Sequence, residues 1–147
     1  MAMRIAILAD VHGNLLALEA MLADLQRRGG ADHVVDLGDC ASGPVWPRET
    51  MERLSGLGAM TVGGNHDRQV ATLHPSEMNA SDRFAFDQLT PDQRKRLGSL
   101  PAALTVVPGV MAFHASPRCD DAYLAEEVQD AAWCEGRCRA SRTGSAL

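Results

Sequence analysis

The sequence predicts an α/β fold with a βαβαβ core, because two kinds of apolar pattern alternate along its first half. Short apolar runs typical of buried strands occupy residues 4–9, 33–37 and 59–62. Residues 14–28 place leucines at helical spacing and end in two glycines, while residues 47–57 begin with a proline that suits the first turn of a helix. Two βα units in series favour a parallel sheet.

The second half of the chain predicts two further helices and a hairpin. Residues 81–89 are expected to form the first of these helices. The stretch from Thr90 to Gln93 matches a capping box with proline at the first helical position, and it opens a helix that continues through Leu97. Residues 104–113 contain two strand-like runs around a Pro-Gly pair, which predicts a turn between two strands.

Length and composition favour a single domain, since the chain has 147 residues of which 46% are hydrophobic. The net charge of −5 and the lack of a basic stripe argue against general nucleic-acid binding. Near the N-terminus only five apolar residues, from Ile5 to Ala9, precede Asp10. This run is too short for a signal sequence or a membrane span, so we expect a cytoplasmic protein without membrane association. The four cysteines are scattered, which favours reduced thiols.

Polar side chains follow the predicted strands at their carboxyl ends. Asp10 and His12 follow the first strand, and Asp39 follows the second. The run GNHD at residues 64–67 follows the third strand, and His114 comes directly after the last strand-like run. Because the carboxyl ends of parallel strands meet at one edge of a sheet, where α/β proteins bind their ligands, we expect these side chains to converge on one site.

The residue types at this edge fit a pair of divalent metal ions. Carboxylate, imidazole and amide groups are mixed, which suits Mn²⁺, with Fe, Zn²⁺ and Ni²⁺ as alternatives, and differs from the thiolate sets of structural zinc. A carboxylate such as Asp39 has two oxygens and can bridge ions about 3.5–4 Å apart. The candidate ligands are Asp10, His12, Asp39, Asn65 and His114.

Four short motifs occur in an order that resembles a known family. They are Asp10-Val11-His12, Gly38-Asp39, Gly64-Asn65-His66-Asp67 and His114. In this order they are similar to the first motifs of the calcineurin-like metallophosphoesterases. The runs DVHGN, GGNHD and HASPR most resemble the small bacterial phosphodiesterase and phosphatase branch of that family. The resemblance covers residues 3–128 and implies an α/β/β/α sandwich. It also implies two ligand sets, Asp10, His12 and Asp39 for the first ion, and Asp39, Asn65 and His114 for the second.

The resemblance further implies an activity and roles for other residues. A metal-bound hydroxide would hydrolyse a small phosphoester substrate, and a phosphodiester, a phosphomonoester, a dinucleoside polyphosphate and a phosphoprotein all stay open as that substrate. His66 would protonate the leaving oxygen, and Asp67 would orient His66. Arg118 is close to His114 in the sequence, and it is expected either to touch a phosphate oxygen or to be an ordinary surface residue.

The sequence departs from the family after residue 128. The Gly-His-x-His motif that closes the family's metal site does not occur in it. We therefore expect residues 1–128 to form the N-terminal part of the domain, with the second half of the sandwich largely missing. Residues 129–147 are expected to be a divergent, poorly ordered tail that arose by truncation or a frameshift. The uncovered part of the sheet would then favour a homo-oligomer.

Two other classes of function stay open at this stage. A phosphate-binding module of the doubly wound type would need a glycine-rich loop, and neither G-x-G-x-x-G nor G-x-x-x-x-G-K-S/T occurs. An inactive truncated remnant, or a regulatory module, would keep the βα core without loading two metal ions. The sequence thus predicts a metal-dependent phosphoester hydrolase first, and an inactive remnant or regulatory phosphate-binding module as the alternative.

Overall fold

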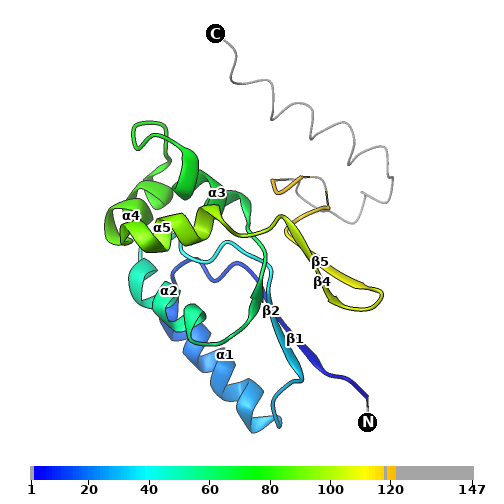
Figure 1. Ribbon diagram of the computed structural model, residues 1–147. Coiled ribbons are helices and arrows are strands. Elements are labelled where there is room, and N and C mark those ends of the chain that lie inside the picture. Colours follow the sequence, from blue (N-terminus) through cyan, green and yellow to red (C-terminus); the bar gives the residue numbers. More distant parts are fainter. Residues whose placement is uncertain (1, 118, 122–147) are drawn as a thin grey trace, which may run out of the picture.

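Three parallel strands form the centre of the fold in the computed structural model, which describes residues 2–117 and 119–121. The strands β1 (Ile5–Leu8), β2 (His33–Asp36) and β3 (Met60–Thr61) lie in the order β1-β2-β3. The helices α1 (Leu15–Arg27) and α2 (Pro47–Ser55) make the connections between them (Figure 1). This arrangement confirms the predicted α/β class and the parallel sheet, although β3 is shorter than the sequence predicts.

The ends of α1 follow from its local sequence. The side-chain oxygen of Asn14 accepts a hydrogen bond from the backbone N–H of Ala17 (3.0 Å), which caps the first turn. Gly29 and Gly30 follow the last turn with φ angles of 88° and 73°, in the left-handed region that glycine adopts without strain. The buried face of the helix is anchored by Leu18. The chain can therefore turn back and enter β2 beside β1.

The other three helices, α3 (Asn65–Thr72), α4 (Ala80–Gln88) and α5 (Pro91–Gly98), lie together at one end of the molecule (Figure 1). The positions of α4 and α5 agree with the predicted helices. The capping box is present, because the hydroxyl of Thr90 accepts the N–H of Gln93 and the Gln93 side chain accepts the N–H of Thr90.

The helix α3 was not predicted from the sequence. Its segment NHDRQVAT is short and contains only one buried aliphatic side chain, Val70, so it has too few apolar positions to indicate a helix. The helix is fixed instead by its first turn, where the carboxylate of Asp67 accepts the N–H of Gly64 (3.1 Å). The motif at residues 64–67 is therefore the start of a helix that points at the sheet edge.

The last two strands form a hairpin. Strands β4 (Ala103–Val107) and β5 (Val110–Phe113) pair antiparallel, as predicted for residues 104–113. Gly109 in the turn has a φ of 83°. The hairpin delivers its carboxyl end, and with it His114, to the edge at which β1 and β2 also end.

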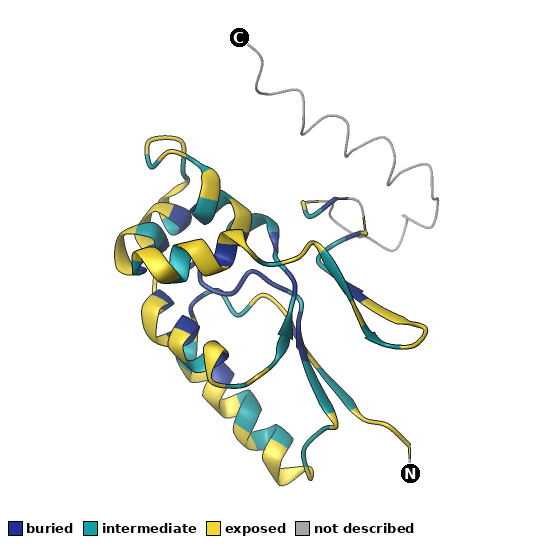
Figure 2. Ribbon diagram, in the orientation of Figure 1, coloured by how far each residue is buried: buried dark blue, intermediate teal, exposed yellow. Residues whose placement is uncertain are grey.

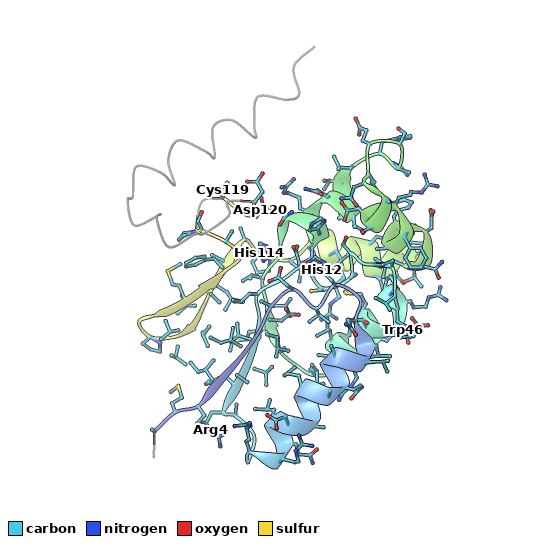
Figure 3. The ribbon with its side chains drawn as sticks, turned by 180° about the vertical axis from the view of Figure 1, so that it is seen from behind. Arg4, His12, Trp46, His114, Cys119 and Asp120 are labelled. Atoms are coloured by element: carbon cyan, nitrogen blue, oxygen red, sulfur yellow. The ribbon has the colours of Figure 1, made fainter. Side chains whose placement is uncertain are left out.

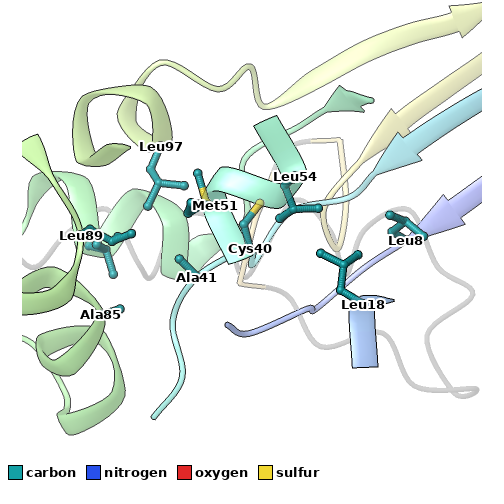
Figure 4. Close-up of a cluster of buried hydrophobic side chains, with 10 residues drawn as sticks. Leu8, Leu18, Cys40, Ala41, Met51, Leu54, Ala85, Leu89 and Leu97 are labelled. Carbon is teal, nitrogen blue, oxygen red and sulfur yellow. The ribbon is translucent and has the colours of Figure 1, made fainter. Parts of the chain in front are cut away.

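Apolar side chains pack on both faces of the parallel sheet. On the other face from the helices, Val35 and Val62 pack against Ala112 of the hairpin. Residues 38–43, in the loop after β2, are all buried, and Figure 2 shows buried positions gathered around the sheet and the loops at its edge. The larger cluster lies on the helical face (Figure 4) and consists of Leu8, Leu18, Cys40, Ala41, Met51, Leu54, Val70, Ala85, Leu89 and Leu97.

Two further expectations concern the membrane and the cysteines. Within the described ranges, none of the helices combines the length and the apolar character needed to cross a bilayer. Cys40 is a buried thiol, and Cys134 and Cys138 lie outside the described residues. The predicted domain boundary at residue 128 and the tail over residues 129–147 lie outside the described residues.

Candidate metal centre

Three of the predicted metal ligands meet at the carboxyl edge of the sheet. Asp10 and His12 lie in the loop after β1, and Asp39 lies in the loop after β2. One ligand atom from each of the three lies within 4.8 Å of the others. The Nε2 atom of His12 is 3.7 Å from Oδ1 of Asp10 and 3.9 Å from Oδ2 of Asp39. The first predicted ligand set is therefore assembled as a group that could hold one cation.

A second histidine approaches the same carboxylate from the hairpin. The Nε2 atom of His114 is 3.6 Å from Oδ2 of Asp39, and its side chain is only 12% exposed. Figure 3 shows His12 and His114 close together at the centre of the molecule, seen from behind. The carboxylate of Asp39 is 4% exposed and faces both imidazoles. It therefore occupies the position expected of a shared ligand.

Hydrogen bonds to backbone carbonyls fix both imidazole rings. Nδ1 of His12 lies 2.6 Å from the carbonyl oxygen of Ser42, and Nδ1 of His114 lies 2.8 Å from that of Leu37. A carbonyl oxygen only accepts, so Nδ1 carries the hydrogen and donates it. In a neutral ring Nε2 is then left with its lone pair directed toward Asp39. A lone pair facing a carboxylate is unfavourable unless a cation lies between them, so the donor set fits a bound metal ion.

The backbone of the cluster is held in an uncommon conformation. Asp10, His12 and Asp39 have φ angles of 56°, 49° and 55°, which lie in the left-handed region that side-chain-bearing residues seldom adopt. Hydrogen bonds between the two loops hold this conformation, from Asp10 N–H to Gly38 O (3.0 Å) and from His12 N–H to Asp39 O (2.9 Å). Backbone strain of this kind clusters at functional sites, where surrounding structure over-determines the conformation.

The N-terminus of α3 approaches the cluster closely. The backbone N–H of His66 donates to Oδ1 of Asp39 (3.0 Å), and Oδ2 is the oxygen that faces the two histidines. Gly64 permits this approach, because a Cβ atom at that position would overlap the Asp39 carboxylate. Asn65, the fifth predicted ligand, is half-buried and is the first residue of α3. In the chain, Asn65 lies between Gly64, which contacts Asp39, and His66, whose backbone N–H bonds to Asp39.

The structure brings a residue to His66 that was not predicted from the sequence. Nδ1 of His66 lies 2.8 Å from Oδ1 of Asp82, a fully buried residue in the first turn of α4. The hydroxyl of Ser42 donates to the same carboxylate oxygen. In the sequence, Asp82 follows the helix-capping residue Asn79 by three positions, so it has the ordinary signature of an acid at a helix start. No local signal would have connected it with His66.

Asp67 does not have the position that the family resemblance implied. We expected it to orient His66, but Asp82 contacts the ring of His66. The carboxylate of Asp67 instead accepts three backbone N–H groups, from Asp39 (2.8 Å), Cys40 (3.0 Å) and Gly64 (3.1 Å). The reason is the helix that the sequence did not predict, since α3 directs the third residue of its first turn back at its own cap. Asp67 therefore holds the loop that presents Asp39.

Burial and hydrogen bonding act in opposite directions on Asp67. Its side chain is inaccessible to solvent, and burial raises its pKa from the ordinary 3.8 to about 6, although its amide hydrogen bonds lower it. The neighbouring charge of Asp39 contributes to the increase. A divalent cation on Asp39 would counter that repulsion, so the electrostatics under the site also favour a positive ion.

An open cleft of about 410 Å³ lies beside the candidate ligands. It is lined by Asp10, Val11, His12, Asn14, Ser42, Gly43, Pro44, Val45, His66 and Ser81. Its size is that of a site for a small molecule. Two of the candidate ligands, Asp10 and His12, line it together with His66, whose ring centroid is 5.4 Å from that of His12. Arg118, the predicted phosphate contact, lies outside the described residues.

The fold and this site together define an α/β protein with a candidate metal centre at the carboxyl edge of its sheet. A sequence model of the calcineurin-like phosphoesterase family matches residues 3–131. The chain therefore belongs to the calcineurin-like phosphoesterase family, as its motifs indicated.

Several known proteins resemble the chain over part of their length. A metallophosphoesterase structure from Sphaerobacter thermophilus is 35% identical with a TM-score of 0.65, and 82% of this chain covers 50% of that one. The structure of a proposed diadenosine tetraphosphatase is 30% identical with a TM-score of 0.62, and 77% of this chain covers 50% of it. A hypothetical protein from Pyrococcus horikoshii, at 21% identity and a TM-score of 0.72, shares the fold over 95% of this chain and 66% of its own.

One curated relative matches a shorter stretch. An uncharacterized protein of Methanocaldococcus jannaschii is 40% identical over 63 residues, which are 43% of this chain and 26% of the relative. The chain thus spans about a quarter of this relative and between half and two thirds of the similar structures.

Proposed function

We propose that the chain supplies the metal-binding edge of a phosphoester hydrolase that uses two divalent metal ions. The observation on which this rests is the pair of imidazoles of His12 and His114, each with its Nδ1 on a backbone carbonyl and its Nε2 within 4 Å of Asp39. Neighbouring Asp10 adds a further carboxylate. A set of nitrogen and oxygen donors around one buried carboxylate is typical of hydrolytic metal sites.

Two ions, with Asp39 shared between them, explain the arrangement better than one. Oδ2 of Asp39 faces both histidines, and Asp10 stands on the His12 side only. We assign Asp10, His12 and Asp39 to the first ion, and Asp39, Asn65 and His114 to the second. The oxygen and imidazole donors favour Mn²⁺, with Fe, Zn²⁺ and Ni²⁺ as alternatives. When bound, the ions would supply positive charge for the phosphoryl oxygens and would lower the pKa of an attacking water.

The chain's own residues position the substrate and move one proton. In the hydrolysis, the oxygen of water forms a new bond to phosphorus and releases its proton to solvent. The bond to the leaving oxygen breaks, and its electron pair stays on that oxygen. His66 lines the cleft next to His12 and would give a proton from Nε2 to this leaving oxygen. The second product is then an alcohol and not a free alkoxide.

The cleft suits a small phosphoester. Its wall combines the polar residues Asn14, Ser42 and Ser81 with the apolar residues Pro44 and Val45. One similar structure is that of a proposed diadenosine tetraphosphatase, which places nucleotide phosphoanhydrides among the substrates to be tested along with phosphodiesters and phosphomonoesters.

Metal binding and hydrolysis can be measured together on the purified chain. We expect a Mn²⁺ titration monitored by electron paramagnetic resonance to find two bound ions per chain. Hydrolysis of bis(4-nitrophenyl) phosphate should begin at the Mn²⁺ concentration at which these ions bind. The substitution His114→Ala should lower Mn²⁺ affinity at least about 10-fold, since a direct ligand matters no less than its outer partners.

His74→Ala is the matched control, because His74 is exposed and bonds to Ser76 far from the cluster in the chain. A wild-type chain that binds no Mn²⁺, or a His114→Ala variant that binds it as the wild type does, would overturn the proposal. In the first case a regulatory or phosphate-binding module becomes the better description.

A further inference from the structure

Asp82 is a buried acid in the first turn of α4 whose carboxylate is hydrogen-bonded to His66, Ser42 and Asn79. Its side chain is 0% exposed. Oδ1 lies 2.8 Å from Nδ1 of His66 and also accepts the hydroxyl of Ser42, while Oδ2 accepts Nδ2 of Asn79 (2.7 Å). Acids in the first turn of a helix ordinarily remain at the surface. This one is turned inward and saturated with hydrogen bonds.

The contact fixes which nitrogen of His66 is available for chemistry. A carboxylate only accepts hydrogen bonds, so the hydrogen between the two groups is carried by Nδ1 of His66. The ring lines the cleft, and Nε2 is the nitrogen that remains for it. The hydroxyl of Ser42 lies 3.5 Å from the same Nδ1, and it donates a hydrogen bond to the same oxygen of Asp82.

We propose that Asp82 is a positioning residue that holds His66 with its Nε2 atom directed at the leaving group. The inference rests on the proposed function of His66 as the proton donor. When Nε2 has given its proton to the leaving oxygen, the neutral ring keeps the Nδ1 hydrogen bonded to Asp82. In this tautomer Nε2 can take up another proton without a flip of the ring. Asp82 therefore keeps His66 ready for the next catalytic cycle.

Ser42 connects this pair to the candidate metal ligands. Its carbonyl oxygen accepts Nδ1–H of His12, and its hydroxyl donates to Asp82. A Cβ at the next position, Gly43, would overlap the carbonyl of His12. Only glycine therefore lets this loop pass so close to the backbone of His12. One short loop thus sets the ring of a metal ligand through its backbone and the ring of the proton donor through its side chain.

The tautomer of His66 can be measured without any activity. In metal-free chain with ¹⁵N-labelled histidine, long-range ¹H–¹⁵N spectra distinguish the two neutral tautomers. We expect the Nδ1–H form for His66 in the wild type. In Asp82→Asn, whose side chain can also donate to Nδ1, we expect the Nε2–H form to become the major one. Asp87→Asn is the control, because Asp87 is on the same helix but half-exposed and paired with Arg83.

Kinetics give a second readout that a merely structural role would not move. With Mn²⁺ present, Asp82→Asn should slow hydrolysis of a methyl ester of phosphate at least about 10-fold, and that of a nitrophenyl ester less than about 3-fold, because only the poor leaving group needs the proton. Asp87→Asn should change neither rate, and circular dichroism verifies that both variants are folded.

Each result decides the proposal. An Nε2–H tautomer in the wild type overturns it, and this measurement needs no variant. An unchanged tautomer in folded Asp82→Asn, or equal losses on both esters, also overturns it. If the wild-type chain hydrolyses neither ester, the proposed function has failed, and the spectra alone then decide whether Asp82 positions His66.

Discussion

The two walls of the cleft are built in different ways. The first wall, with Asp10 and His12, comes from the loop after β1, which backbone hydrogen bonds join to the loop that carries the buried ligand Asp39. The second wall includes His66 of α3, whose ring is bonded to the buried carboxylate of Asp82 in α4. The first wall gathers groups that attract a cation, whereas the second fixes a single imidazole by a buried carboxylate.

This difference separates two tasks. The first wall brings negative charge together, which a positive ion among the ligands would stabilise. The second wall pairs each donor with an acceptor and needs no ion to be satisfied. We therefore expect substitutions in the first wall to act on metal binding, and substitutions in the second to act on the use of the leaving group.

The largest effect is expected for Asp39→Asn. The change keeps the size of the side chain but removes the charge that faces both His12 and His114. Hydrolysis with Mn²⁺ should fall by more than about 100-fold, since loss of a shared ligand should exceed the loss caused by an outer partner. The rate at saturating Mn²⁺ and the number of ions bound are the measurements, with Asp87→Asn as control. Retained activity would show that Asp39 is not a metal ligand, and the proposed difference between the two walls would then not hold.

A smaller and more selective effect is expected for His66→Ala. The side chain belongs to the second wall, so Mn²⁺ affinity should stay within about 3-fold of wild type while general acid catalysis is lost. Hydrolysis of an alkyl ester should fall about 100-fold, and that of a nitrophenyl ester by less than about 10-fold. Comparing the two substrates under saturating Mn²⁺ tests this. Equal losses on both would show that His66 acts on metal binding, as the first wall does.

The first wall could be predicted from the sequence because its signals are local. A strand that ends in an acid or a histidine is visible in a few residues, and parallel strands necessarily bring their carboxyl ends together. The alternation of strands and helices gave α1, α2, α4 and α5 for a similar reason, since each has caps or apolar spacing of its own.

The second wall could not be predicted, because it depends on how helices pack. α3 lacks an apolar repeat, so the motif that contains His66 and Asp67 did not indicate a helix. The family resemblance implied the next acid in the motif, Asp67, as the partner of His66. The actual partner, Asp82, is 16 residues away in the chain, and only the packing of α4 against α3 brings it to the ring. Left-handed backbone at Asp10, His12 and Asp39 is only weakly indicated by residue type, because Asp and His enter that region more often than most residues but still seldom.

Asp67→Asn should affect stability more than catalysis, since Asp67 touches backbone and not the cleft. Its carboxylate accepts from Asp39, Cys40 and Gly64. An amide group would place an N–H donor against at least one of these donors, and we expect a loss of about 1–3 kcal/mol in the free energy of unfolding at neutral pH. Urea unfolding of the metal-free protein measures it. No loss would mean that the loop presenting Asp39 is held by its other contacts.

The pH dependence of that same loss is the finest test of how the loop is held. Burial raises the pKa of Asp67 from 3.8 to about 6, so between these values the folded chain binds more protons than the unfolded chain. The resulting stabilisation is complete below the unfolded value and disappears as the pH rises through the folded one. It amounts to at most about 3 kcal/mol, from a displacement of the pKa to about 6. The stability difference between wild type and Asp67→Asn in metal-free protein should therefore be larger at low pH than at neutral pH. A difference that is constant across this range, or one that grows toward neutral pH, would show that the amide hydrogen bonds outweigh burial at Asp67.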